Sequence, residues 1–281
     1  MGIQTMDLEF ITCPVCAVQG TSPLLNKDGF SIVTCNHCNL KYVNPRLKAS
    51  NLEENYIDGY YPVAKRNHIQ HNEMEWLQMK ERLDEIQRKF PHKGRILDLG
   101  CGMGTFLYLA RKKGWETFGV DLSQDGVGFA RENYNLDIFC GSVFEIGFPS
   151  HHFDVITLYH VLEHIPEPNL LLAELRRILK PKRGCLVVEV PNGESIQIRI
   201  QGKNWPYVHP ADHLYYFSVS TLTKLLKKHG FNRVEAGKPK RVGRRNGVIN
   251  QLKFATQYSV SSVLVKYNLA TIIRCYATSN Q

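Results

Sequence analysis

The first strong hydrophobic pattern of the chain lies in residues 71–90. Apolar residues recur there with charged residues between them, at Met74, Leu77, Leu83 and Ile86. This spacing is typical of an amphipathic helix.

From residue 95 onward, short apolar runs alternate with helical patterns. The apolar runs predict strands at 95–100, 115–121, 136–140, 153–161, 185–191, 231–236 and 271–278. Helical periodicity with capping residues predicts helices at 105–114, 123–134, 167–181 and 218–230, and an amphipathic segment at 246–266. Strands that alternate with helices at this spacing form a parallel sheet with helices on both faces. The pattern therefore predicts an α/β fold.

The segment before this pattern carries two matched pairs of cysteines. Cys13 and Cys16 form one C-x2-C turn, and Cys35 and Cys38 form a second after an 18-residue gap. Four thiolates at this spacing supply tetrahedral zinc coordination, and so small a module needs such a metal to fold. An iron site and a metal-free ribbon are the alternatives, whereas a redox C-x2-C would need only one pair.

These patterns divide the chain into four parts. We expect a zinc ribbon at 1–45, a linker with the amphipathic helix at 46–93, and the α/β core at 94–236. A basic loop, a helix and the last strand at 237–281 would complete the sheet.

Composition narrows the class of protein. Of the 281 residues 43% are hydrophobic, and the net charge is +9. Such a chain can bury a sizeable core. It has no apolar run of membrane-spanning length and no secretory signal pattern, so we expect a cytoplasmic protein without a membrane partner. The positive charge is compatible with binding to nucleic acid, with binding to a phosphorylated small molecule, or with a basic surface that is only solvated.

The stretch "DLGCGMG" carries the most specific chemistry. Glycines stand at 100, 102 and 104, but Thr105 occupies the position where a dinucleotide loop needs its third glycine, and no Gly-Lys-Ser/Thr follows for a P-loop. Asp98 precedes the loop, where a carboxylate suits an amine better than a pyrophosphate. Asp121 ends the next strand, where an acidic side chain can hold ribose hydroxyls. An amine and a ribose without a phosphate together describe S-adenosylmethionine (SAM).

With these features the chain resembles the class I SAM-dependent methyltransferases. The resemblance rests on the glycine loop, "GVDLS", "FDVITLYHVLEHIPEP", "LRRILKPKRGCLVVEVPN" and "HPADHLYYFSVSTLTKLLKKHGF". It is strongest to ubiquinone-biosynthesis O-methyltransferases and deoxysugar C-methyltransferases, and the cysteine ribbon looks like the zinc module of the sugar enzymes. The resemblance implies a seven-stranded, mostly parallel Rossmann-like sheet with a small N-terminal zinc ribbon.

The resemblance also implies a role for each residue of the cofactor site. Asp98 would lie near the methionine amine, the loop residues Gly100, Cys101 and Gly102 under the methionine and ribose, and Asp121 on the ribose hydroxyls. The residues expected near the adenine and the sulfonium are Leu122, Ser142, Val143, Tyr159 and His160. In this family an acidic residue usually stands where Ser142 does.

Catalytic candidates lie in two histidine-containing stretches. "YHVLEHI" holds His160, Glu163 and His164, and "HPADHLYYF" holds His209, Asp212 and His213. The resemblance implies that the acidic-His-x-x-Tyr-Phe pattern is the active-site segment, which favours His213 as the general base. We expect Tyr216 or Tyr60 to position the substrate and Trp205 to form a wall of the pocket.

The predicted function is methyl transfer from SAM to a small molecule, such as a sugar, a nucleotide-linked sugar or a related hydroxylated metabolite. One alternative is an RNA methyltransferase whose ribbon recognises RNA. The stretch after the fourth strand lacks the N/D-P-P-Y motif that methylation of an exocyclic base amine would call for. The ribbon also lacks the regularly interleaved aromatic and basic residues that stack on bases, so nucleic acid is the less favoured partner. A further alternative is a non-catalytic protein with the SAM-binding fold.

Overall fold

The computed structural model describes residues 8–49, 73–237 and 269–279. The predicted segment at 246–266 and Tyr60 lie outside these ranges. None of the helices within them is long and apolar enough to cross a membrane.

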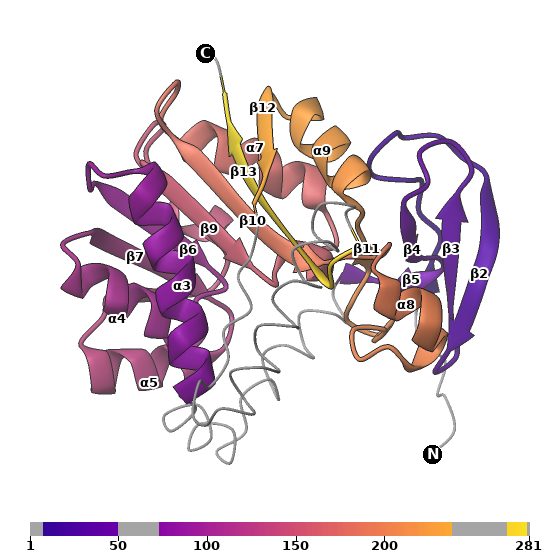
Figure 1. Ribbon diagram of the computed structural model, residues 1–281, viewed down its shortest axis with the longest axis horizontal. Coiled ribbons are helices and arrows are strands. Elements are labelled where there is room, and N and C mark those ends of the chain that lie inside the picture. Colours follow the sequence, from indigo (N-terminus) through magenta and orange to yellow (C-terminus); the bar gives the residue numbers. More distant parts are fainter. Residues whose placement is uncertain (1–7, 50–72, 238–268, 280–281) are drawn as a thin grey trace, which may run out of the picture.

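A seven-stranded sheet forms the centre of the structure, in the order β12-β13-β10-β9-β6-β7-β8 (Figure 1). Its strands are β6 (Arg95–Leu99), β7 (Glu116–Asp121), β8 (Ile138–Cys140), β9 (Val155–Tyr159), β10 (Cys185–Pro191), β12 (Arg233–Ala236) and β13 (Ile272–Thr278). Neighbours from β10 to β8 pair in parallel, whereas β13 runs antiparallel to both β10 and β12. The predicted α/β architecture with a mostly parallel sheet of seven strands is confirmed.

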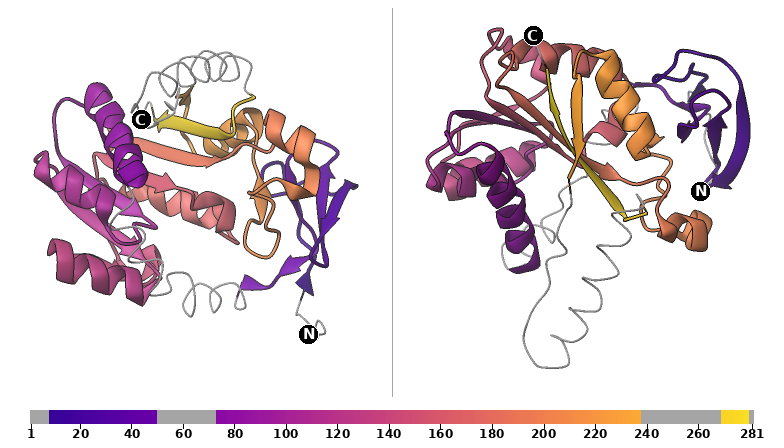
Figure 2. Two further views of the ribbon diagram at one scale, coloured as in Figure 1. Left: turned by 60° about the horizontal axis from the view of Figure 1, so that its bottom comes forward. Right: turned by 45° about the horizontal axis from the view of Figure 1, so that its top comes forward.

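Helices cover both faces of this sheet (Figures 1 and 2). One face carries α3 (Glu73–Lys89), α4 (Thr105–Lys112) and α5 (Gln124–Tyr134), and the other carries α7 (Pro168–Ile178) and α9 (Val219–Lys228). Successive strand residues point to opposite faces. In β6, accordingly, Ile96 packs on the face covered by α3, α4 and α5, and Leu97 and Leu99 pack on the face covered by α7 and α9.

Short elements form the loops at the carboxyl ends of the strands. They are α6 (Val143–Ile146), the 3-10 helix η1 (Leu162–His164), α8 (Ile196–Gln201) and the 3-10 helix η2 (Gly202–Asn204). Ser123 and Ser218 cap α5 and α9 as predicted, because each side chain accepts a hydrogen bond from a backbone N–H three residues on.

The cysteine ribbon is a small antiparallel sheet that the core completes. Its strands β2 (Thr21–Lys27), β3 (Phe30–Cys35) and β4 (Lys41–Val43) are joined at the edge by β11 (Tyr215–Tyr216). In addition, β1 (Leu8–Glu9) pairs with β5 (Arg46–Leu47). Because β11 comes from the insertion after β10, ribbon and core share this four-stranded sheet.

Buried polar contacts strengthen this junction. The guanidinium of Arg46 is almost fully buried and donates to the carbonyl of Pro166 at 2.6 Å and to the hydroxyl of Tyr215 at 2.8 Å. Lys41 donates from Nζ to the carbonyl of Gly193 at 2.7 Å. The ribbon is therefore fastened to the loops that follow β9 and β10.

Candidate active site

The glycine loop turns sharply between β6 and α4. Gly100 has a φ of +72°, and a Cβ there would lie 2.4 Å from Cγ2 of Val161. The N–H groups of Gly100 and Cys101 both donate to the carbonyl of Val120. Only glycine fits this left-handed, crowded position, which draws the loop against the end of β7.

Asp121 at the end of β7 faces the same loop. One carboxylate oxygen accepts from the N–H of Gly102 at 2.6 Å, and the other accepts from the N–H of Ser123 at 2.8 Å. Burial raises the pKa of Asp121 above its usual range, while these N–H donors act in the opposite direction. The loop is thus tied to the carboxylate that the sequence assigned to ribose.

Asp98 is buried beneath the loop. Its Oδ1 accepts from the hydroxyl of Thr157 on the neighbouring strand at 2.6 Å. Burial raises the pKa of this carboxyl to about 7, although Thr157 and Arg82 favour the ionised form. Thr157 lies one strand away, and no sequence motif linked it to Asp98.

A single cavity of about 680 Å³ connects these groups. All nine residues predicted to bind the cofactor line it, namely Asp98, Gly100, Cys101, Gly102, Asp121, Leu122, Ser142, Val143 and Tyr159. His160 and His164 line its other side. One face of α3 also contributes, through Met74, Gln78, Met79 and Arg82, which the sequence analysis did not anticipate.

Ser142 is the N-cap of α6, a role that a sequence motif could have indicated. Its hydroxyl accepts from the N–H of Phe144, and its own N–H donates to Glu145 at 2.7 Å. This reciprocal pair is a capping box, written in the sequence as S-x-x-E. Ser142 therefore organises the start of α6 at the wall of the cavity.

His160 lies between two buried carboxylates at the end of β9. Its Nδ1 is 3.4 Å from Glu163 Oε1, and its Nε2 is 3.4 Å from Glu189 Oε1. Burial alone would lower the pKa of His160, but these two carboxylates raise it to about 9. The ring is therefore an imidazolium at neutral pH, stacked over Tyr207 with parallel planes.

A buried ion-pair network supports His160. Glu189 accepts from Arg82 of α3 and, at 2.6 Å, from Nε of Arg274 of β13. Burial would raise the pKa of Glu189, yet Arg82, His160 and Arg274 hold it well below its usual range. Arg274 also reaches Glu85 of α3 at 2.5 Å, so helix and sheet share these charges.

The predicted catalytic residues His213 and Tyr216 are not part of the lining of the cavity. The ring of His213 meets that of His164 edge to face, with centroids 4.5 Å apart. Burial and then the neighbouring His164 lower the pKa of His213 to about 4. Tyr216 lies in β11, and its buried hydroxyl has no hydrogen-bond partner among the described residues. Trp205 is almost fully buried and packs in the core instead of lining the cavity.

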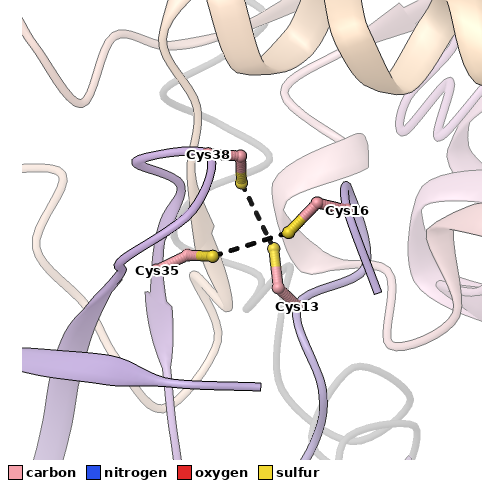
Figure 3. Close-up of side chains that lie close together, drawn as sticks. All are labelled: Cys13, Cys16, Cys35 and Cys38. Atoms are coloured by element: carbon pink, nitrogen blue, oxygen red, sulfur yellow. Dashed lines mark hydrogen bonds between the residues drawn. The ribbon is translucent and has the colours of Figure 1, made fainter. Parts of the chain in front are cut away.

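The four ribbon cysteines converge on one point (Figure 3). The Sγ atoms of Cys13 and Cys38 are 3.4 Å apart, and those of Cys16 and Cys35 are 3.6 Å apart. A disulfide needs about 2.05 Å. Four thiolates about 2.3 Å from a tetrahedral zinc would stand roughly 3.8 Å apart, so the cluster fits this ion.

The sheet order, the glycine loop and the carboxylate after β7 define the fold and site of a SAM-dependent methyltransferase. The sequence profile of the methyltransferase domain family matches residues 69–236. The chain therefore belongs to this family.

Individual relatives agree with this assignment. A ubiquinone biosynthesis O-methyltransferase of Coxiella burnetii is 29% identical over 106 residues, which cover 36% of this chain and 45% of that protein. The match thus spans about half the length of this curated relative.

Two solved structures share the fold. A SAM-dependent methyltransferase from Archaeoglobus fulgidus has a TM-score of 0.50 at 22% identity, over 71% of this chain and 93% of that one. Phosphoethanolamine N-methyltransferase 2 of Haemonchus contortus, in complex with SAM, has a TM-score of 0.57 at 16% identity, over 92% and 71%.

Proposed function

We propose that this protein transfers a methyl group from SAM to a small hydroxylated molecule, such as a sugar or a nucleotide-linked sugar. The observation that carries the proposal is the single cavity in which all nine predicted SAM-binding residues meet His160 and His164. The O-methyltransferase named among the relatives supports oxygen as the acceptor atom.

The glycine-loop side of the cavity suits SAM. Asp98 offers a carboxylate for the methionine ammonium, Asp121 offers two oxygens for the ribose hydroxyls, and Leu122 and Val143 offer apolar contact for adenine. SAM supplies a methyl group on a sulfonium that is already activated for transfer. The chain's task is then to hold the acceptor in line, which can contribute about 7–11 kcal/mol.

The histidine side would receive the acceptor. His213 activates the acceptor hydroxyl, and the simplest mechanism is that its Nδ1 takes the hydroxyl proton. This nitrogen is buried and has no hydrogen-bond partner among the described residues. His160 contributes positive charge, because both of its ring nitrogens face carboxylates. Tyr216 helps to position the acceptor from β11.

The ribbon cysteines would bind a structural zinc ion. Four thiolates fill the coordination shell and leave no open position for catalysis. Zinc would stabilise β3 and β4, and through β4 the strand β11 that follows His213. All eight cysteines are unpaired, which is consistent with a reducing cytoplasm.

The test uses SAM with a radioactive methyl group, incubated with the protein and a cell extract. At a SAM concentration below its Kd, we expect acid-soluble labelled product with the wild type and roughly 10–100-fold less with Asp121→Ala, whose ribbon should remain intact. Acid-precipitable counts that ribonuclease removes would refute the small-molecule proposal in favour of RNA. Binding of SAM without any transfer would indicate a non-catalytic protein.

A further inference from the structure

A second group of metal-ligating side chains lies beside the cavity. Glu163 and His164 come from η1, and His213 comes from the insertion before β11. One ligand atom from each of the three lies within 4.8 Å of the others. Two segments that are about fifty residues apart in the sequence thus bring a carboxylate and two imidazoles to one point.

Buried polar atoms of Glu163 and His213, two members of this group, lack the hydrogen-bond partners that buried atoms normally have among the described residues. Glu163 is fully buried, and neither of its carboxylate oxygens accepts a hydrogen bond from the described residues. His160 is an ion-pair neighbour at 3.4 Å, but its geometry does not form a hydrogen bond. Nδ1 of His213 is likewise buried and without a partner in the same ranges.

Such atoms call for an explanation, because an unsatisfied buried polar group costs about 1–3 kcal/mol and a charged one costs more. An ion absent from the coordinates is one of the recognised explanations. Here Glu163 and His213 share the deficit, and each offers a ligand atom close to one of His164, so that a single cation between the three side chains would satisfy both.

The surroundings also favour histidine ligation. Nδ1 of His164 is 3.0 Å from the carbonyl oxygen of Asp212. A proton on Nδ1 that bonds to this carbonyl places the lone pair of the ring on Nε2, the arrangement that orients metal-binding histidines. Asp212 precedes His213, so one short segment supplies both a ligand and the support for another.

We propose that Glu163, His164 and His213 bind one divalent transition-metal ion at the acceptor side of the cavity. Two imidazoles and a carboxylate suit zinc or a similar ion and leave a coordination position open. The chain would then hold two metal sites of different kinds, one closed by four cysteines and one open toward the cavity through His164.

The open position gives the ion a role that rests on the proposed function. An acceptor hydroxyl bound there would have a lowered pKa and would release its proton to water, leaving an alkoxide or phenolate on the ion. In this form His213 acts as a ligand and no longer takes the proton itself. Acceptors with a second oxygen next to the reacting one could fill a further position, which favours vicinal diols and catechols.

The experiment measures metal stoichiometry on the full chain. The protein is first saturated with zinc, dialysed against a weak chelator so that the cysteine site stays filled, and then titrated with Co²⁺. We expect a second equivalent with weak d–d bands and no thiolate charge-transfer band. In Glu163→Gln and in His213→Gln its affinity should fall at least about a hundredfold.

The matched control is His209→Gln. His209 is exposed, and its ring centroid is 5.8 Å from that of His213, so this variant should keep the second equivalent. SAM binding, measured by calorimetry, reports whether each variant is folded. Should Glu163→Gln fail to fold, His213→Gln and the rise in the wild type's Tm with Co²⁺ still decide the matter.

Each outcome separates the ion from the reaction. One equivalent in the wild type, or a second equivalent retained by both variants, overturns the metal site. Methyl transfer at full rate with only the cysteine site filled overturns the role of the ion in the reaction and returns His213 to the role of base. A second equivalent lost in both variants supports the metal site even if no acceptor is ever methylated, in which case only the proposed function fails.

Discussion

The two sides of the cavity are built in different ways. The proposed SAM side is assembled from the ends of neighbouring strands that are close in the sequence: the N–H of Gly102 donates to Asp121, and the N–H of Gly100 donates to the carbonyl of Val120. The proposed acceptor side is lined by His160 and His164; His164 packs against His213 of the insertion after β10, and that insertion pairs with the ribbon, so this side depends on segments distant in the sequence. Local chain geometry can organise the first side, whereas the second depends on long-range contacts.

This difference predicts that damage to the ribbon reduces methyl transfer much more than it reduces SAM binding. Zinc binding of roughly 10–16 kcal/mol would be folding energy for this module. In Cys35→Ser we expect methyl transfer to fall at least about a hundredfold, because β4 no longer holds β11, while the Kd for SAM changes less than about threefold. Filter binding of SAM and transfer of its labelled methyl group measure the two effects.

The control for this variant is Cys140→Ser, which removes a half-buried thiol outside the ribbon. It should retain zinc and activity. Equal losses of SAM binding and transfer in Cys35→Ser would mean that the two sides are one cooperative unit, against the comparison above.

The converse variant acts on the SAM side. Asp121→Ala removes the acceptor of the Gly102 and Ser123 N–H bonds and the proposed ribose contact. Hydrogen bonds to a charged group are worth about 1.5–3 kcal/mol, so SAM should bind roughly 10–100-fold more weakly. Calorimetry tests this, and bound zinc should remain at the wild-type level. An unchanged Kd would remove Asp121 from the site.

The junction itself can be weakened without touching the cysteines. Arg46→Ala deletes the buried donor to Pro166 and Tyr215, which come from the segments that follow β9 and β10. We expect a loss of about 2–3 kcal/mol in stability and roughly tenfold in kcat/KM for the acceptor, with the Kd for SAM unchanged.

Chemical denaturation and kinetics on the labelled product measure these effects. Gln19→Ala, which changes an exposed side chain of the ribbon, is the comparison variant. If Arg46→Ala lowered stability but left kcat/KM intact, the junction would hold the fold without shaping the acceptor site.

The smallest effect is a pH dependence confined to the SAM side. The pKa of Asp98 is raised to about 7, so below this pH the carboxyl is protonated and must ionise to pair with an ammonium. SAM affinity should therefore rise between pH 5.5 and 7, by at most about tenfold per unit. Asp98→Asn should bind more weakly and flatten this profile.

The same carboxyl affects the ligand-free protein in the opposite direction. A carboxyl whose folded pKa exceeds its unfolded value stabilises the protein at low pH. This contribution is lost as the pH rises from about 4 to 7. A wild-type Kd that stays constant from pH 5.5 to 7 would contradict the pairing of Asp98 with the ammonium.

What the sequence predicted follows the same division. Strand periodicity, the glycine loop and the spacing of the cysteines are local patterns, and the α/β sheet they predicted is confirmed. Element boundaries shifted by a few residues, as for the strand expected at 153–161, which spans Val155–Tyr159.

Contacts between distant segments carried no such pattern. β11 and β4 are short strands from separate regions of the chain, and neither has a sequence pattern that indicates pairing with the other. The charges on Arg82, Glu189 and Arg274 lie in three different elements, so their network appears only once the sheet is assembled. The lack of a hydrogen-bond partner for Glu163 among the described residues is likewise a property of the folded interior.

The antiparallel strand β13 has a consequence for synthesis on the ribosome. It lies between β10 and β12, yet it is the last of the described strands to be translated. Until β13 leaves the ribosome, β12 cannot pair with its neighbour in the described sheet and β10 has an open edge. Glu189 then also lacks Arg274, one of its two arginine partners. A nascent chain stalled at that stage would expose edges prone to pairing with other chains, which makes it a substrate for chaperones rather than a slower enzyme.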